Sequence, residues 1–315
     1  MSDNPTDFLS AADFTGAQIL HVLDLADQMA EQRTARVAAG EDLTRDVLAS
    51  RSVALLFEKP SLRTRASFEI GVQELGGIAL PMWDSEIKLG RRETVADTGR
   101  VLERYAHAIV VRTFSHEGLE ELADAVQVPV VNALSDLEHP CQALADLQTF
   151  RNVHGSFEGR SLAYIGDGNN VAHSLLLACA AVGLSVRVGH PDGYAPDAAI
   201  VAQAETLAHA TGAAVTVTDD PVAAVASADA VYTDVWASMG QEDEADARKQ
   251  QFQPYQVNTE LMSHAADDAI FLHCLPAHRG EEVTADVLES AASHVFDQAE
   301  NRLHAQKALL ATLLT

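Results

Sequence analysis

A short polar motif follows the first strongly apolar segment of the chain, and its residue types suit an anion. Val53–Phe57 is an apolar run typical of a buried strand, and a Pro-Ser turn then leads into Ser61-Leu62-Arg63-Thr64-Arg65. Ser61 is a favourable helix N-cap, so free backbone N–H groups and two guanidinium groups are expected to meet at one helix start. That combination is typical of a phosphate site. An ordinary capped helix with solvated arginines would have the same short sequence, so the rest of the chain decides.

Three further motifs follow in a fixed order and give the first one its context. They are His139-Pro140-Cys141-Gln142, then Asp234-Val235-Trp236-Ala237-Ser238-Met239-Gly240, then His273-Cys274-Leu275-Pro276. Together with Ser-x-Arg-Thr-Arg they resemble the carbamoyltransferase family, and within it the members that use ornithine. The resemblance extends from about Phe57 to the C-terminal helix that carries Arg302. It implies an enzyme that transfers the carbamoyl group of carbamoyl phosphate to the δ-amine of L-ornithine, giving L-citrulline and phosphate, in arginine metabolism.

The resemblance also implies which residues contact each substrate. Carbamoyl phosphate is expected to contact Ser61, Leu62, Arg63, Thr64, Lys88, Arg112, His139, Pro140, Cys141, Gln142, Cys274, Leu275 and Arg302. Ornithine is expected to contact Asn170, Asp234, Ser238 and Met239. Within the first set, Arg63, Arg112, His139 and Cys274 are expected to be catalytic. The Leu275–Pro276 peptide bond is expected to be cis.

The chemistry of these side chains agrees with the implied roles. A histidine donor and a carboxamide, such as His139 and Gln142, can polarise a carbonyl oxygen and hold an amide nitrogen, the two ends of a carbamoyl group. Arg112 ends an apolar strand, which favours an anionic partner, although a surface salt bridge would explain it equally well. Asp234 suits the α-ammonium group of an amino acid. Because carbamoyl phosphate is already activated, neither a metal nor a cofactor is expected.

Two positions depart from the family pattern. Leu62 stands where many members have threonine, so only its backbone amide is expected to bind phosphate. Lys88 stands where the family usually has a glutamine or histidine that reaches the phosphate in the neighbouring subunit, and lysine keeps a donor there while adding charge. An exposed lysine on a loop is the alternative interpretation. If the shared role holds, the minimum functional unit is a homotrimer, alone or in a higher assembly of trimers.

The alternation of apolar runs with amphipathic segments predicts an α/β protein with parallel sheets, and 315 residues favour two domains. The strands of the first domain are expected at Val53–Phe57, Ala79–Trp83, Ala108–Arg112 and Val128–Asn132. Those of the second are expected at Leu162–Ile165, Ser185–Gly189, Ala214–Val217, Ala230–Thr233 and Ile270–His273. A polar joint, Arg151–Ser156, places the boundary near residue 150. The resemblance implies a carbamoyl phosphate-binding domain at 1–150, an ornithine-binding domain at 151–298, and a C-terminal helix, 299–315, that crosses back to the first domain.

A glycine-rich turn leaves open a function of another class. Gly166-Asp167-Gly168-Asn169-Asn170 follows an apolar strand, and Asp192 follows the next one, as in dinucleotide-binding folds. The third glycine of that pattern is replaced by Val171, which weakens the alternative of an NAD-dependent oxidoreductase. In the carbamoyltransferase interpretation Asn170 binds the carboxylate of the amino acid instead.

Charge and cysteine content exclude several classes of protein. The chain has 46 Asp and Glu against 21 Lys and Arg, a net charge of −25, which disfavours binding to nucleic acid or to an anionic membrane. Such acidity suits a halophile with a salt-rich cytoplasm, although an acidic protein of an ordinary cell has the same composition. The charged run Gln241–Lys249 is expected to be solvated. Three cysteines without metal-ligand spacing, no long apolar run and no signal-like N-terminus favour a soluble, cytoplasmic enzyme.

The acceptor and the direction of the reaction stay open at this point. The same transfer could use putrescine, an acylated ornithine or another amine, although Asp234 with Ser238-Met239-Gly240 favours a free amino acid. Arginine synthesis and arginine fermentation would use the same residues.

Overall fold

The computed structural model describes residues 6–237 and 245–315, and the chain divides into two compact units. The first unit contains Met1–Gln148 and Glu300–Thr315, and the second contains Thr149–Ala299. Each unit has one parallel sheet flanked by helices, which confirms the predicted fold class.

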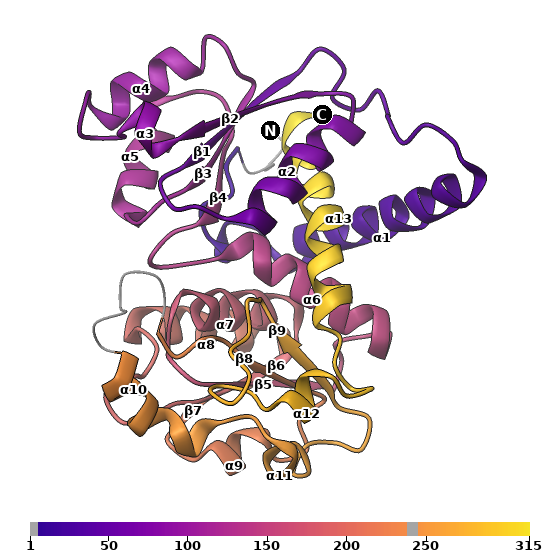
Figure 1. The fold of residues 1–315 in the computed structure, drawn as a ribbon, viewed down its shortest axis with the longest axis vertical. Helices are drawn as coiled ribbons and strands as arrows, with labels where there is room; N and C mark the ends of the chain where they lie inside the picture. Colours follow the sequence, from indigo (N-terminus) through magenta and orange to yellow (C-terminus); the bar gives the residue numbers. More distant parts are fainter. Residues whose placement is uncertain (1–5, 238–244) are drawn as a thin grey trace. The chain divides into compact units, whose positions relative to one another are not determined.

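The first unit is a four-stranded parallel sheet in the order β2-β1-β3-β4 (Figure 1). Its elements are η1 (Ala11–Asp13), α1 (Gly16–Ala39), β1 (Ser52–Phe57), α2 (Leu62–Glu74), β2 (Ile78–Trp83), α3 (Asp84–Ile87), α4 (Val95–Leu102), β3 (Ala108–Arg112), α5 (His116–Ala125) and β4 (Val130–Leu134). The strand order reverses between β1 and β3, and Phe57 pairs with Arg112 there. Open parallel sheets place ligands at such a reversal, outside the carboxyl ends of the strands.

Apolar strands and amphipathic helices build the core of the first unit. Ile109 and Val111 of β3 pack with Leu119 and Leu122 of α5 and with Leu102 of α4. The prediction for β4 was wrong by two residues, since the strand covers Val130–Leu134 rather than 128–132. Pro129 has no N–H to donate, and the first ladder residue, Val130, donates its N–H to Asp7 Oδ1 at 2.7 Å.

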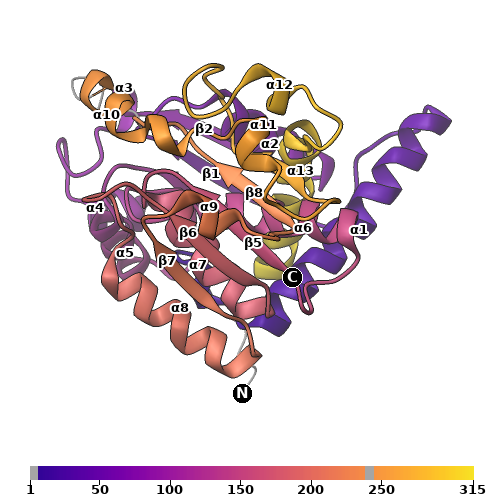
Figure 2. The same cartoon turned by 90° about the horizontal axis from the view of Figure 1, so that it is seen from below.

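The second unit is a five-stranded parallel sheet in the order β7-β6-β5-β8-β9, of which Figure 2 labels β7, β6, β5 and β8. Its elements are β5 (Ser161–Ile165), α7 (Asn170–Val182), β6 (Ser185–Gly189), α8 (Ala198–Thr211), β7 (Val215–Thr218), α9 (Pro221–Val225), β8 (Ala230–Thr233), α10 (Ala245–Phe252), η3 (Gln253–Tyr255), α11 (Thr259–Met262), β9 (Ile270–His273) and α12 (Ala285–Leu288). The order reverses between β5 and β8, where Ile165 pairs with Thr233. The glycine-rich turn and Asp234 therefore follow neighbouring strand ends.

Two helices continue from one unit into the other along the chain. They are α6 (Pro140–His154) and α13 (Val295–Leu314). The polar joint Arg151–Ser156 begins within α6, which is helical as far as His154, and the two units divide between Gln148 and Thr149. The C-terminal helix was correctly predicted to return to the first unit, where α13 lies beside α2 (Figure 1). Lys307 of α13 approaches Gly71 of α2, whose missing Cβ leaves space for the lysine stem.

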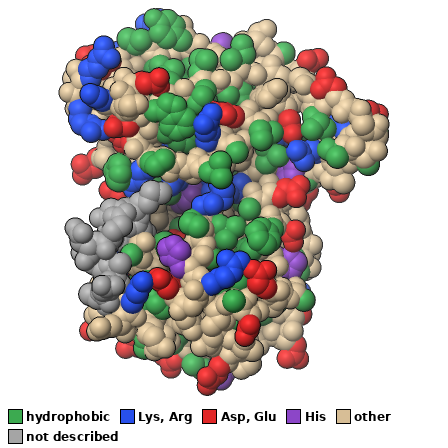
Figure 3. All heavy atoms as spheres, viewed as in Figure 1, with side chains coloured by type: hydrophobic (Ala, Val, Ile, Leu, Met, Phe, Trp, Pro, Cys, Tyr) green, Lys and Arg blue, Asp and Glu red, His purple; other side chains and the backbone are tan. Residues whose placement is uncertain are grey.

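The surface reflects the acidic composition. On the face shown in Figure 3, Asp and Glu side chains are spread over both units. Within the described ranges, no helix combines the length and the apolar character that crossing a membrane requires.

Candidate active site

The predicted phosphate motif forms a capped helix start at the strand reversal of the first unit. Ser61 is the N-cap of α2, and its Oγ accepts the Thr64 N–H at 3.3 Å and donates to Thr64 Oγ1 at 3.1 Å. The side chain of Leu62 is 80% exposed, so only its backbone amide is turned to this helix start. The geometry offers hydroxyl and amide groups to an anion at the positive end of a helix.

The two arginines of the motif differ in their surroundings. Arg65 Nε is 2.8 Å from Glu69 Oε1, and its guanidinium group lies over the Trp83 ring. Arg63 is half-buried and forms no ion pair with any residue in the described ranges. Arg63 is therefore the motif arginine whose charge is available to a ligand.

A hydrogen-bonded chain joins the motif to two other expected site residues. Arg302 on α13 donates from Nη2 to Thr64 Oγ1 at 2.9 Å and from Nη1 to Gln142 Oε1 at 3.0 Å. Gln142 in turn donates to Asp146 Oδ1 at 2.8 Å. These side chains are all buried, so the network fixes the guanidinium group of Arg302 beside the phosphate motif.

His139 lies among the arginines of the same unit. Its pKa is held well below the ordinary value, first by burial and then by the positive charges of Arg302, Arg112 and Arg63. The ring is therefore neutral near pH 7. Burial also raises the pKa of Cys141 to about 12, and its Sγ donates to the Asn132 carbonyl at 3.3 Å, so this cysteine is a packed, neutral thiol. Pro140 is the first residue of α6.

Two lysines of the first unit have distinct environments. Lys88 is exposed and adopts φ +48° after α3, a left-handed conformation that is unusual for lysine.

Lys59 is an additional cation that was not predicted from the sequence. It is buried, and its Nζ lies 4.0 Å from the centre of the Phe114 ring. Burial, followed by the charge of Arg112, lowers the pKa of Lys59. The sequence feature that could have identified Lys59 is its position two residues after the end of β1, where open parallel sheets place their ligands.

In the second unit, Asp234 is the centre of a compact polar group at the strand reversal. Its Oδ2 accepts from Asn169 Nδ2 at 2.9 Å and its Oδ1 from Cys274 Sγ at 3.0 Å. Asn169 Oδ1 accepts from Tyr164 Oη and from the first N–H groups of α7. Burial, followed by the charge of Asp234, raises the pKa of Tyr164 well above its ordinary value, so the phenol remains a donor.

Asn169 thus belongs to this polar group, although the sequence indicated its neighbour Asn170 as the ornithine contact. Asn170, the predicted ligand, is half-buried at the first position of α7, one residue after the cap. The signal was available, because an Asn just before a helix is a preferred N-cap.

The glycine-rich turn is shaped for the chain itself rather than for a dinucleotide. A Cβ on Gly168 would lie 2.2 Å from the Pro196 nitrogen and 2.4 Å from the Ala195 carbonyl carbon. The loop after β6 therefore occupies the space in which a pyrophosphate would approach the second glycine. Asn169 already caps the helix start beside it.

A buried pair supports the His-Cys-Leu-Pro motif. The Leu275 N–H donates to His273 Nδ1 at 2.9 Å, so the other ring nitrogen carries the proton and donates to Glu282 Oε1 at 3.1 Å. Leu275 has φ +58°, and the cis Leu275–Pro276 peptide bond is confirmed. Glu282 was not predicted as part of this motif.

The charged run after Asp234 is only partly solvated. Arg248 is buried, donates to Asp167 Oδ2 at 2.8 Å and to the Trp236 carbonyl at 3.1 Å, and lies over the Tyr194 ring. The prediction of a solvated run was therefore wrong at this residue. Ser238 and Met239, expected to bind ornithine, lie outside the described residues.

In the described part of the chain, two groups of three side chains have potential metal ligands within 4.8 Å of one another. They are Asp234, His273 and Cys274, and His278, Glu281 and Glu282. Both ring nitrogens of His273 are already in hydrogen bonds, and Glu281 pairs with Lys249 at 2.8 Å. Each group is thus tied into contacts that a metal would have to replace.

Comparisons with known proteins agree with this geometry. A family model described as the carbamoyl-P binding domain of aspartate/ornithine carbamoyltransferase matches residues 6–152, and one described as its Asp/Orn binding domain matches residues 158–313. Ornithine carbamoyltransferases of Anoxybacillus flavithermus and Geobacillus stearothermophilus are 53% and 52% identical to the chain. These matches cover 98% and 100% of this chain and 96% and 99% of the relatives.

A solved structure gives the same picture at the level of the fold. The ornithine carbamoyltransferase of Pyrococcus furiosus matches with a TM-score of 0.94 and 47% identity. The match covers 100% of this chain and 98% of that one. The likeness therefore extends over both sheets and both continuous helices.

Proposed function

The chain belongs to the aspartate/ornithine carbamoyltransferase family, and we propose that it transfers the carbamoyl group of carbamoyl phosphate to the δ-amine of L-ornithine, giving L-citrulline and phosphate. The observation that carries this proposal is the buried network of Thr64, Arg302 and Gln142, together with the available charge of Arg63. It prepares a phosphate cradle beside a neutral histidine.

The first unit supplies the groups that bind and activate carbamoyl phosphate. Ser61, Thr64 and the Leu62 amide donate to the phosphate, and Arg63 neutralises its charge. Arg63, Arg112 and neutral His139 donate hydrogen bonds to the carbamoyl oxygen, which becomes negative when the carbon is attacked. A neutral imidazole can donate there because its N–H remains in place. Gln142 acts by orienting Arg302, and Cys141 packs the helix start.

The second unit supplies the groups for the amino acid. Asp234 accepts hydrogen bonds from the α-ammonium group, and Asn170 binds the α-carboxylate. Cys274 faces the δ-amine, which must be deprotonated before attack because its ordinary pKa is near that of lysine. The δ-ammonium group first loses one proton to solvent, and the neutral amine then forms the new N–C bond. The carbonyl re-forms from the oxyanion as the C–O bond to phosphate breaks, and the departing phosphate accepts the second proton of the amine. Ser238 and Met239 remain predicted ornithine contacts.

We also propose that the active site is completed by a second copy of the chain, in a homotrimer. Support comes from Lys88, which is exposed in a strained left-handed conformation directly after α3. Such strain at an exposed residue is typical of functional loops. Mixing inactive Lys88→Ala and inactive Arg63→Ala subunits, followed by dissociation and reassembly, should restore activity, because some hybrid sites contain both native residues. Activity no higher than that of the separate variants would contradict a shared site.

The substrate assignment is tested with an acceptor panel. Carbamoyl phosphate is combined with L-ornithine, N-acetyl-L-ornithine, putrescine or L-aspartate, and the carbamoylated product and phosphate are both quantified. Ornithine is expected to give the highest kcat/KM. A higher value with putrescine would show that the α-carboxylate and α-ammonium contacts are absent, and the absence of turnover with every acceptor would contradict carbamoyl transfer itself.

A further inference from the structure

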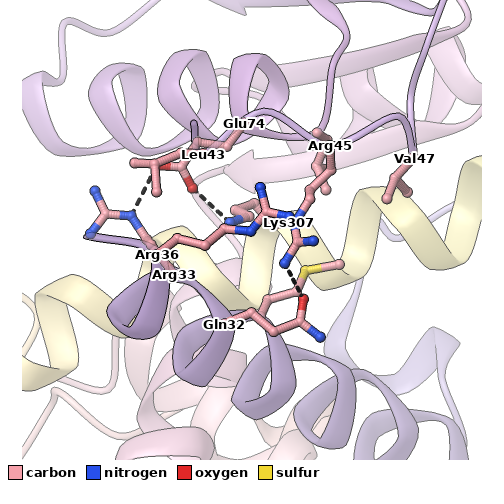
Figure 4. A pocket seen from close by; sticks show the side chains of 10 residues that line it. Gln32, Arg33, Arg36, Leu43, Arg45, Val47, Glu74 and Lys307 are labelled. Carbon is pink, nitrogen blue, oxygen red and sulfur yellow. Dashed lines mark hydrogen bonds and ion pairs between the residues drawn. The ribbon is translucent and has the colours of Figure 1, made fainter. Parts of the chain in front are cut away.

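A cationic cavity lies in the first unit, at the opposite end of α2 from the phosphate motif. It has a volume of about 130 Å³ and is bordered by the C-terminal half of α1, the loop that follows, the end of α2 and α13. Figure 4 shows Arg33, Arg36, Arg45 and Lys307 converging on it. Because α2 has 13 residues, its two ends are about 20 Å apart. The cavity is therefore separate from the proposed active site.

One buried carboxylate serves two of these four cations. Glu74 Oε1 is 2.9 Å from Arg33 Nε, and Glu74 Oε2 is 2.7 Å from Lys307 Nζ (Figure 4). Burial alone would raise the pKa of Glu74, but the hydrogen bonds and charges of Lys307 and Arg33 lower it, so the group is ionised. Both of its oxygens are occupied.

The other two cations are bound to neutral oxygens. Arg45 Nη2 donates to Gln32 Oε1 at 2.7 Å, and Arg36 Nη1 donates to the Asp42 carbonyl at 2.6 Å. The acid nearest to Arg36 is the exposed Glu41, at 4.0 Å. Each guanidinium group has five N–H donors, so most of this donor capacity remains for a ligand. Positive charge is thus concentrated here in a chain with 46 acidic and only 21 basic residues.

We infer that this cavity binds the phosphate group of a small phosphate monoester. The two forked guanidinium groups of Arg36 and Arg45 match phosphate oxygens in geometry, and a dianion matches their combined charge. Met29, Leu43 and Val47 line the remainder of the cavity and provide apolar contact for the organic part of the ester. This site is distinct from carbamoyl phosphate binding and does not depend on the proposed function.

The experiment measures binding of phenyl phosphate by isothermal titration calorimetry to the full-length chain. Arg63→Ala serves as the background, because it weakens binding at the phosphate motif. In this background we expect one phenyl phosphate per chain. Adding Arg36→Gln and Arg45→Gln should weaken that binding at least tenfold. Arg100→Gln with Arg104→Gln is the matched control, since it removes two exposed arginines of the same unit that lie outside the cavity.

Unchanged affinity in the Arg36→Gln/Arg45→Gln variant would overturn the inference, as would equal weakening in the control pair, which would indicate a general charge effect. A second variant, Arg36→Lys/Arg45→Lys, keeps the positive charges but loses the bidentate geometry of the guanidinium groups. It should bind phenyl phosphate with intermediate affinity. Far-ultraviolet circular dichroism of each variant identifies any loss of folding. Turnover of carbamoyl phosphate by the cavity variants in the otherwise native chain is expected to equal that of the native enzyme.

Discussion

At the scale of single residues, the strongest prediction concerns Arg63. It is the motif arginine without an ion pair in the described ranges, and it is proposed to contact both the phosphate and the developing oxyanion. Loss of one such donor costs about 10²–10³ in kcat, so Arg63→Ala should lower kcat by at least that factor. Arg65→Ala is the control on the same helix, since Arg65 pairs with Glu69. Equal kcat values for the two variants would remove Arg63 from the site.

Asp234 should affect one substrate much more than the other. Asp234→Asn removes the charge that faces the α-ammonium group, so the KM for ornithine should rise at least tenfold while that for carbamoyl phosphate changes less than threefold. Asn169→Ala, which removes a donor to Asp234, should have the same direction and a smaller size. Steady-state kinetics with each substrate varied in turn measures both. Parallel increases in both KM values would contradict the assignment.

The buried neutral His139 predicts a pH dependence of stability. Its native pKa lies below the ordinary 6.5, so between these two values the unfolded chain binds a proton that the native chain does not. This contribution to stability is present above pH 6.5 and is lost as the pH falls toward the native pKa. His139→Gln should therefore reduce the slope of unfolding free energy against pH below 6.5, by up to about 1.4 kcal/mol per pH unit. Urea denaturation at several pH values measures the slope, and His264→Gln, at an exposed position, is the control.

At the scale of the elements, the start of α2 has both a structural and a chemical task. Ser61 caps the helix and is proposed to contact phosphate. An N-cap serine replaced by alanine costs about 1 kcal/mol, whereas glycine costs only a few tenths. Ser61→Ala and Ser61→Gly should therefore raise the KM for carbamoyl phosphate equally, while only the alanine variant loses appreciable thermal stability. If both properties changed in proportion, the serine would be a cap alone.

Local patterns were sufficient for most elements, because buried parallel strands are continuous apolar runs. The predicted and observed limits of β3 coincide, and those of β1 differ by one residue. The start of β4 was missed because Asp7, more than a hundred residues earlier in the chain, supplies the acceptor for Val130. Arg248 was misjudged for the same reason: its partner, Asp167, is 81 residues away.

The same distinction between local patterns and distant partners applies to the residues of the candidate site. Motif residues such as Ser61 and Cys274 were proposed as substrate contacts from residue type and order alone. Asn169, Glu282 and Lys59 were not proposed. The N-cap position of Asn169 and the place of Lys59 just after β1 were local signals, but the local sequence does not show that Asn169 bonds to Asp234 or Glu282 to His273. The hydrogen bond from Arg302 to the Gln142 amide oxygen is likewise not visible in the sequence. Sequence patterns thus propose which groups bind the ligand, but they do not show what holds those groups in place.

At the scale of the whole molecule, charge and assembly should be coupled. Each chain carries −25, so copies brought together in a trimer repel one another, and the repulsion extends about 30 Å at 0.01 M salt but only about 3 Å at 1 M. We therefore expect trimers at molar salt and dissociation in dilute buffer, more complete at lower protein concentration. Because Lys88 is proposed to complete a neighbouring site, activity should fall together with the trimer, before secondary structure is lost. Sedimentation velocity, activity and circular dichroism across one salt series test this: a fully active monomer would contradict the shared site, whereas a stable trimer in dilute buffer would contradict the salt dependence alone.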